Sequence, residues 1–355
     1  MGRILLVSLA CFGAVLLVVS SALAYRIYRQ QQDARAFAIR TPNGIDEAGF
    51  VRIGGIDQWV TIRGEDRSNP VILILHGGPG LAYSPLFAWF RPWERWFTVV
   101  QWDQRGAGKT YGRYGKATPS LSRETIVSDG IALSDYLRGH LHKDRIVLLG
   151  HSWGSTVGLE MVARRPDLFA AYVGTGQVVD AAQEVAAHAM ALDAARKAND
   201  DGAVRALQAV QPPYATARQM MAAHMRASAY APAAERAYVT RSLPTALFAP
   251  GYSLTDLYDN GAAGLYSIGP LYRDVSSFDA HRLGASFAVP VIIIQGDLDN
   301  VTPTASVRDY FDEIAAPRKD LVVLPGDGHM ALLTDPDRVL AVLVARVRTR
   351  SAPTR

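Results

Sequence analysis

The sequence feature that most constrains the fold is a series of short apolar runs, each about five residues long and separated from the next by longer segments. These runs are Val71–Leu75, Thr98–Trp102, Arg145–Leu149, Phe169–Val173, Val289–Gln295 and Leu321–Leu324. Unbroken runs of this kind are typical of parallel strands that are buried on both faces. Phe50–Ile53 and Gln58–Arg63 predict an opening hairpin around Gly54-Gly55. We therefore predict an α/β fold with a mostly parallel sheet and helices on both faces.

Polar or glycine-rich clusters follow most of these runs directly. The clusters are His76–Gly80, Asp103–Gly106, Gly150–Gly154, Gly296–Asp299 and Gly326–His329. Because the carboxyl ends of parallel strands meet at one edge of the sheet, and ligands bind there, we expect these clusters to form a single site.

The strand pattern stops between Gly176 and about Ala285, where alanine and other helix-forming residues dominate. Proline breaks this segment at Pro212-Pro213 and at Pro250. We interpret residues 176–285 as a helical cap over the site. The cap divides the predicted core into a first part, residues 45–175, and a second part, residues 286–355.

The N-terminal segment has its own character. Ile4–Ala24 is a run of 21 residues without a charge, which as a helix could span a hydrocarbon core of roughly 30 Å. We interpret residues 1–25 as a single-pass membrane anchor and residues 26–44 as a polar linker. The alternative is a signal peptide cleaved near Ala24, which would leave a secreted or periplasmic protein, because Ala22-Leu23-Ala24 has the small-x-small form of a cleavage site.

Charge and cysteine content exclude other classes. The net charge of +4 comes from residues 1–40, which hold five arginines and one acidic residue, and the remainder is neutral. Nucleic-acid binding is therefore not predicted. The single cysteine, Cys11, excludes an internal disulfide and argues against a cysteine-based metal site. We predict no metal, and the sequence leaves the oligomeric state open.

Gly150-His151-Ser152-Trp153-Gly154 fits the Gly-x-Ser-x-Gly nucleophile elbow, between a predicted strand and a predicted helix. The turn is so tight that a Cβ at either glycine would collide with the neighbouring strand or helix. Ser152 itself is expected in a strained backbone conformation that exposes its hydroxyl group. We therefore predict Ser152 as a nucleophile.

A serine nucleophile needs a histidine base and an acid to orient it, and sequences with this elbow place them in the order serine, acid, histidine. His329 fits this order, whereas His281 has no preceding acid at a strand end. Asp297 and Asp299 both follow the strand before it. We favour Asp299, in the Gly-x-x-Asp-x-x-x-Pro pattern, and expect Asp297 to bind amides of its own turn.

Acyl transfer also needs two N–H donors for the oxyanion. Trp153 follows the nucleophile at the start of a helix, whose dipole favours negative charge. The second donor is expected from the loop His76–Gly80, with Gly78 as the first choice and Gly77 as the second.

Three motifs together identify a resemblance. They are His76-Gly77-Gly78-Pro79-Gly80, Asp103-Gln104-Arg105-Gly106-Ala107-Gly108 and Gly150-His151-Ser152-Trp153-Gly154-Ser155. In this order the chain, over roughly Phe50–Ala345, resembles the α/β-hydrolase family of proline iminopeptidases and related serine aminopeptidases. The resemblance implies release of an N-terminal residue, commonly proline, from short peptides without a cofactor. It also implies the triad and oxyanion donors predicted above.

The cap departs from that pattern. The family's cap offers acidic residues that hold the substrate's free amine, but no characteristic cap motif matches here. Glu184, Glu235 and Asp259 are candidates by residue type alone. A carboxylester hydrolase on the same scaffold, acting on a small ester in place of a peptide, is therefore the alternative hypothesis.

Overall fold

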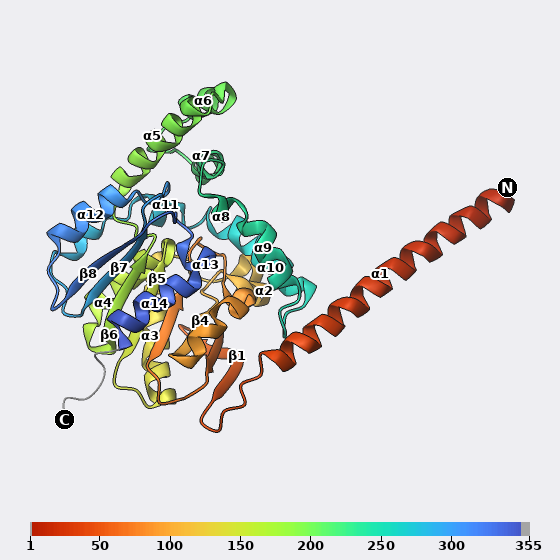
Figure 1. The fold of residues 1–355 in the computed structure, drawn as a ribbon, viewed down its shortest axis with the longest axis horizontal. Coiled ribbons are helices and arrows are strands. Elements are labelled where there is room, and N and C mark those ends of the chain that lie inside the picture. Colours follow the sequence, from red (N-terminus) through yellow and green to blue (C-terminus); the bar gives the residue numbers. More distant parts are fainter. Residues whose placement is uncertain (1, 349–355) are drawn as a thin grey trace.

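The computed structural model describes residues 2–348 of the chain (Figure 1). Residue 1 and residues 349–355, which belong to the predicted segments 1–25 and 286–355, lie outside the described residues. Within the described chain a sheet of eight strands has the order β1-β2-β4-β3-β5-β6-β7-β8. The strands are β1 (Ile45–Ile53), β2 (Ile56–Gly64), β3 (Val71–Leu75), β4 (Thr98–Trp102), β5 (Ile146–His151), β6 (Phe169–Thr175), β7 (Val291–Gly296) and β8 (Lys319–Leu324).

The strand directions confirm the mostly parallel sheet. The hairpin β1–β2 is antiparallel, and β2 pairs with β4 in the antiparallel direction. All later neighbours, from β4 through β3, β5, β6 and β7 to β8, are parallel. The carboxyl ends of these parallel strands therefore lie at one edge of the sheet.

Side chains of alternate strand residues are buried on opposite faces. In β3, Val71, Leu73 and Leu75 pack into one hydrophobic cluster, whereas Ile72 and Ile74 pack into the other. The first face is covered by α3 (Arg123–Leu141), α4 (Trp153–Arg164) and α12 (Thr304–Glu313). The second face is covered by η1 (Ser84–Arg95), α13 (Ala331–Thr334) and α14 (Pro336–Arg346). Short helical segments complete the core, at α2 (Gly108–Tyr114), η2 (Gly115–Ala117) and η3 (Pro166–Leu168).

Between β6 and β7 the chain forms helices and no strand in the described residues. They are α5 (Ala181–Lys197), α6 (Asp201–Gln208), α7 (Ala217–Ser228), α8 (Ala233–Arg236), α9 (Tyr238–Leu247), α10 (Leu254–Ser267), α11 (Tyr272–Ser276) and η4 (Ala280–Leu283). We call α5–α11 the cap. Figure 1 shows these helices on one side of the sheet.

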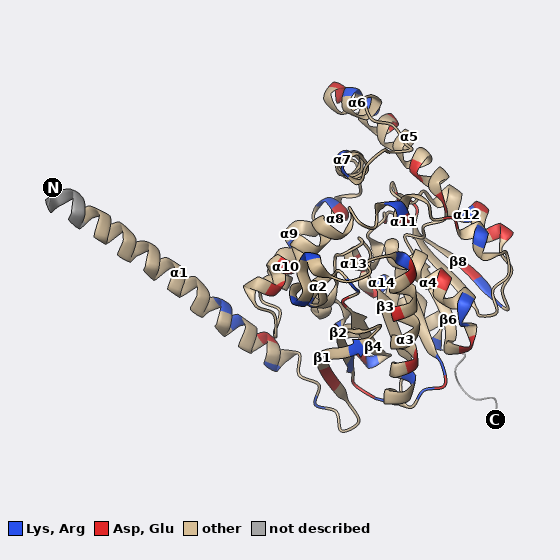
Figure 2. Cartoon of the chain, turned by 180° about the vertical axis from the view of Figure 1, so that it is seen from behind, with Lys and Arg blue, Asp and Glu red and all other residues tan. Residues whose placement is uncertain are grey.

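The N-terminal helix α1 (Gly2–Ala36) projects away from the rest of the molecule (Figure 1). Figure 2 shows that its projecting half lacks charged side chains in the described part, and the apolar side chains from Val7 to Leu23 are exposed. The helix does not end with the apolar run. It continues to Ala36, so residues 26–36, which the sequence predicted as linker, are helical, and the irregular segment before β1 is shorter than predicted.

Candidate active site

Ser152 lies on a tight turn between β5 and α4, at the carboxyl edge of the sheet. Its backbone has φ +52° and ψ −121°, a conformation that is rare for a residue with a side chain. A Cβ at Gly150 would come within 2.4 Å of the Gly154 carbonyl oxygen, and a Cβ at Gly154 within 2.1 Å of the Leu75 carbonyl oxygen. The two glycines therefore have the steric role that the motif predicted.

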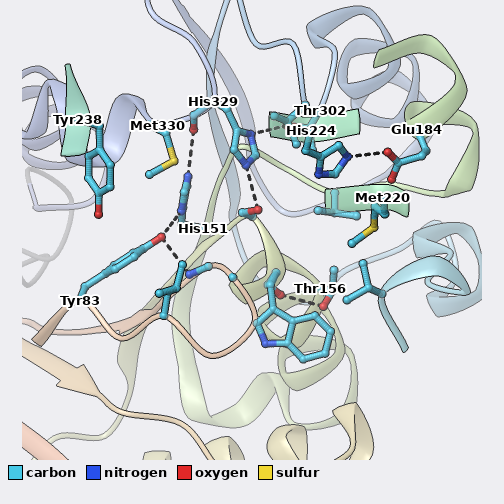
Figure 3. Close-up of a pocket in the computed structure, with 18 of the residues that line it drawn as sticks. Tyr83, His151, Thr156, Glu184, Met220, His224, Tyr238, Thr302, His329 and Met330 are labelled. Carbon is cyan, nitrogen blue, oxygen red and sulfur yellow. Dashed lines mark hydrogen bonds and ion pairs between the residues drawn. The ribbon is translucent and has the colours of Figure 1, made fainter. Parts of the chain in front are cut away.

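Three side chains from separate parts of the sequence meet at this edge. The His329 Nε2 atom lies 2.9 Å from the Ser152 Oγ atom, and the His329 Nδ1 atom lies 3.0 Å from Asp299 Oδ2. Figure 3 shows His329 at the cavity with Thr302 beside its imidazole. Asp299 follows β7, and His329 follows β8. Because a carboxylate only accepts, Nδ1 carries the proton and Nε2 is free to accept from the serine hydroxyl group.

Hydrogen bonds hold the Asp299 carboxylate in one orientation. The Thr302 N–H donates to Oδ1 at 2.7 Å, and the Thr302 hydroxyl and the Gln295 amide each donate to Oδ2 at 2.7 Å. Asp297 instead accepts from the Gly326 N–H at 2.7 Å, in the loop after β8. Asp299 is the carboxylate that contacts His329, whereas Asp297 binds an amide, though of a neighbouring loop and not of its own turn.

The electrostatics of the buried pair follow from its geometry. Burial alone would lower the pKa of His329, but the Asp299 charge and hydrogen bond outweigh it and raise this pKa above its ordinary value. Burial would likewise raise the pKa of Asp299, yet His329 and Thr302 hold it below its ordinary value. Gly176 leaves room for the imidazole, since a Cβ there would come within 2.8 Å of the His329 Cε1 atom.

The backbone N–H groups of Gly77 and Gly78, the two candidate oxyanion donors in the loop His76–Gly80, differ in their hydrogen bonding. The Gly77 N–H donates to the Tyr83 hydroxyl group at 3.0 Å and is therefore engaged. This favours Gly78, which has φ +120°, over Gly77 as the donor from this loop. Trp153 is the first residue of α4, where backbone N–H groups have no partner within the helix. Gln104 accepts from the Trp153 indole at 3.1 Å and donates to the His76 carbonyl at 3.3 Å, so it connects the two donor segments.

A chain of hydrogen bonds, which we call the Tyr83 relay, links the oxyanion loop to the histidine loop. The Gly77 N–H donates to Tyr83, the Tyr83 hydroxyl donates to His151 Nδ1 at 2.5 Å, and His151 Nε2–H donates to the His329 carbonyl at 3.0 Å (Figure 3). Because the carbonyl only accepts, His151 Nε2 carries a proton, and in the neutral ring Nδ1 then accepts from the Tyr83 hydroxyl group. Burial lowers the pKa of His151 to about 3, which agrees with this assignment.

Ser152 lines a cavity of about 920 Å³ that lies between the core and the cap. Apolar side chains from both parts dominate its lining, among them Leu81, Met220, Tyr238, Leu243 and Met330. Its polar cap groups include Glu184, which lies 2.6 Å from the His224 Nε2 atom, and Tyr214, whose hydroxyl group lies 3.0 Å from the His188 Nδ1 atom.

The three acidic residues predicted to hold an amine lie in different places. Within the described chain, Glu184 lines the cavity and the other two do not. Glu235, in α8, accepts from the Met330 N–H at 2.6 Å beside the histidine loop, and burial raises its pKa. Asp259, in α10, faces Gly112 of α2. Its position away from the cavity argues against its predicted substrate contact.

Sequence reasoning did not assign the residues that support the triad and the oxyanion loop. Gln104 stands inside the second motif and Thr302 inside the Gly-x-x-Asp-x-x-x-Pro pattern, so position in a motif was a usable signal for both. Tyr83 had no comparable signal, because its partner His151 is 68 residues away. Gln295 ended a predicted strand, and nothing in the local sequence indicated that its side chain contacts Asp299.

A family model described as alpha/beta hydrolase fold matches residues 70–336, and the chain belongs to this family. Its relatives make the resemblance more specific. The chain is 28% identical over 307 residues to the probable aminopeptidase YbaC of Bacillus subtilis, covering 80% of this chain and 91% of that protein. It is 26% identical over 313 residues to the proline iminopeptidase of Xanthomonas citri, covering 82% and 93% respectively.

A solved structure extends the similarity over nearly the whole chain. The crystal structure described as a membrane phospholipase A, a bacterial virulence factor, matches with a TM-score of 0.59 and 15% identity, covering 99% of this chain and 100% of that one. At this identity the match shows the shared fold.

Proposed function

We propose that the protein is a serine hydrolase that removes an N-terminal residue of the proline type from peptides through an acyl-enzyme. The observation that carries the proposal is the contact chain from Ser152 through His329 to Asp299, at 2.9 and 3.0 Å. The aminopeptidase and iminopeptidase names of the relatives support the peptide substrate.

In the proposed reaction, the Ser152 oxygen attacks the carbonyl carbon while its proton passes to His329 Nε2. The tetrahedral oxyanion accepts hydrogen bonds from the N–H groups of Gly78 and Trp153, each worth roughly 3–4 kcal/mol in the transition state. His329 then donates its proton to the departing amine, and a water molecule releases the acyl group by the same steps. Asp299 keeps the imidazole in the required tautomer and stabilises its charged form.

Glu184 is the proposed partner of the substrate's ammonium group. It lines the cavity, and a carboxylate there could pair with the amine of an N-terminal residue. Its contact with His224 would have to be shared or exchanged when substrate binds.

The alternative function is carboxylester hydrolysis by the same residues. It is favoured by the apolar lining of the cavity and by the partners of its two acidic side chains in the described residues. Glu184 pairs with His224, and Asp180 accepts hydrogen bonds from the backbone N–H groups at the start of α5. The phospholipase title of the full-length structural match points in the same direction.

Comparing two substrates on the full chain in detergent separates these functions. We expect turnover of proline p-nitroanilide, and activity on a short-chain aryl ester alone would remove the peptidase reading. A fluorophosphonate probe should label the parent protein and leave Ser152→Ala unlabelled. Failure to label the folded parent would contradict both functions.

We also propose that α1 anchors the protein in a membrane as a single span, with a cleaved signal peptide as the alternative. Support comes from the exposed apolar half of the helix and from its unbroken continuation to Ala36. The intact mass of the mature protein tests this proposal, since a chain that begins near Tyr25 would show cleavage.

A further inference from the structure

Two neighbouring cap helices expose apolar side chains. In α10, Leu254, Tyr258 and Leu265 lie on the side opposite the buried residue Ala263, and Tyr258 and Leu265 are 74% and 73% exposed. In α9, Val239 and Leu243 are separated by one turn and are also mostly exposed. We call these five side chains the apolar cap face.

The turn that joins α9 to α10 is held by α1. The Arg26 guanidinium donates to the carbonyl groups of Leu247 and Tyr252 at 3.0 and 2.6 Å, and the Gln30 amide donates to those of Ala249 and Tyr252 at 2.8 Å. Figure 1 shows α9 and α10 beside α1, near the point where α1 leaves the rest of the molecule.

These contacts fix the height of the turn relative to the apolar run of α1. Arg26 lies about 3 Å, and Gln30 about 9 Å, beyond Ala24 along the helix axis, at 1.5 Å per residue. The interfacial layer of a bilayer extends roughly 5–8 Å beyond each side of the hydrocarbon core. If the run Ile4–Ala24 spans that core, the turn between α9 and α10 therefore lies at the level of the lipid headgroups.

We infer that the apolar cap face docks on the surface of the same bilayer that α1 enters. Apolar side chains of a surface-bound helix are stabilised when they enter the boundary between headgroups and acyl chains, at a depth of roughly 5–10 Å. The partner is a phospholipid surface. The inference rests on the proposed anchoring by α1.

Docking in this position also orients the cavity. Val239 and Leu243 belong to the apolar cap face and line the cavity at the same time. In this arrangement the side of the cavity formed by these residues faces the membrane surface, where molecules with an apolar chain concentrate.

Depth-dependent fluorescence quenching of the full chain in phosphatidylcholine vesicles tests this arrangement. Cys11 is the single cysteine and lies in α1, so an environment-sensitive label there reports insertion of the anchor. In a Cys11→Ser background, Tyr258→Cys and Leu265→Cys place the label on the apolar cap face. Ser68→Cys, an exposed residue before β3 at the opposite edge of the sheet, is the matched control.

We expect lipids spin-labelled near the headgroup to reduce the fluorescence of the Tyr258 and Leu265 labels by about half, because these labels lie at interfacial depth, and to leave the Ser68 label unchanged. A quenched Cys11 label with unquenched cap labels would overturn the docking inference and preserve the anchor. Cys11 lies near the middle of the apolar run, so lipids spin-labelled deep in the acyl chain are the quencher for its label, and a Cys11 label that these lipids leave unquenched would contradict the anchor itself. Cap labels that are shielded by a second copy of the chain would remain unquenched by lipid and would also overturn the inference.

Discussion

The cavity has one wall formed by the core and another formed by the cap helices, which we call the core wall and the cap wall. The two walls differ in how their polar side chains are hydrogen-bonded. On the core wall, Asp299 accepts hydrogen bonds from two neighbouring side chains and from backbone, and the Tyr83 relay joins the oxyanion loop to the histidine loop. On the cap wall, apolar side chains dominate, Glu184 pairs with His224, and Tyr214 is hydrogen-bonded separately to His188, which does not itself line the cavity.

This contrast assigns different tasks to the two walls. A network in which each member fixes the next can hold reacting atoms in position before substrate arrives, which is what transition-state stabilisation needs. A wall of apolar side chains with few polar groups selects substrates by shape and by one or two contacts. Substitutions in the core wall should therefore reduce the rate for every substrate, and those in the cap wall should reduce it selectively.

The largest effect should come from Ser152→Ala. Loss of the proposed nucleophile should lower kcat by about 10⁶-fold for peptide and ester substrates alike. The thermal unfolding midpoint should change little, because the alanine retains the backbone hydrogen bonds of the elbow. Turnover measurements with calorimetry check both, and Ser128→Ala on α3 is the control. Activity within tenfold of the parent would contradict a serine mechanism.

Asp299→Asn should lower kcat by about 10⁴-fold, because the amide can donate to His329 and favours the wrong tautomer. Asp297→Asn is the matched control, since Asp297 contacts the Gly326 amide and not the histidine. Its activity should stay within a few fold of the parent. Equal losses in both variants, measured by steady-state kinetics, would remove the distinction between the two carboxylates.

Glu184→Gln tests whether a substitution in the cap wall reduces activity selectively, in contrast to substitutions in the core wall. If Glu184 pairs with the substrate ammonium group, kcat/KM for proline p-nitroanilide should fall by about 10- to 100-fold, as expected for a hydrogen bond to a charged group. The value for an aryl ester without an amine should fall much less. Asp259→Asn, away from the cavity, serves as the control. Equal losses on both substrates would contradict a selective role for this wall.

Tyr83→Phe tests whether the relay contributes to the core wall. The change leaves His151 Nδ1 without its donor and Gly77 without its acceptor. The free energy of unfolding should fall by about 1–3 kcal/mol, and kcat by about tenfold for all substrates because two loops lose their connection. Denaturant unfolding and kinetics measure the two effects. Tyr258→Phe, on the surface of α10, should change neither, and an unchanged kcat in Tyr83→Phe would show that the relay is purely structural.

The smallest effect concerns pH. The neutral form of His329 accepts the serine proton, so kcat/KM should rise with pH through the His329 pKa, which lies above its ordinary value of about 6.5. Glu235 contributes to raising this pKa. Glu235→Gln keeps the acceptor for the Met330 N–H but removes the charge, and the midpoint should move to lower pH. Glu313→Gln, on the surface of α12, should leave the profile in place, and a midpoint that rises in Glu235→Gln would refute this electrostatic account.

The core was predictable from sequence because its signals are local. Val71–Leu75 and Thr98–Trp102 were predicted with the bounds that the structure gives, since a strand buried on both faces must be apolar along its whole length. The loops that follow these strands were predictable as one site, because the carboxyl ends of parallel strands lie at the same edge of the sheet. Strand order and direction then bring Ser152, Asp299 and His329 together.

The cap and the hydrogen-bonding partners were less predictable. α10 was not predicted as a separate helix, and its Gly261 and Gly264 lower the helix propensity of the segment. The positions of Glu235 and Asp259 depend on how cap helices pack on the core, which residue type does not determine. Tyr83 acts on His151, 68 residues away, and nothing in its local sequence indicates that partner.

The order of the strands has a consequence for synthesis of the protein. Ser152 follows the central strand β5, but the proposed base follows β8, which is the last strand in the described residues and forms an outer edge of the sheet. A nascent chain that has not yet added this strand possesses the serine and lacks the group that activates it. The proposed triad is therefore complete only after β8 and the loop that follows it have been synthesised, which is later than the synthesis of the N-terminal helix.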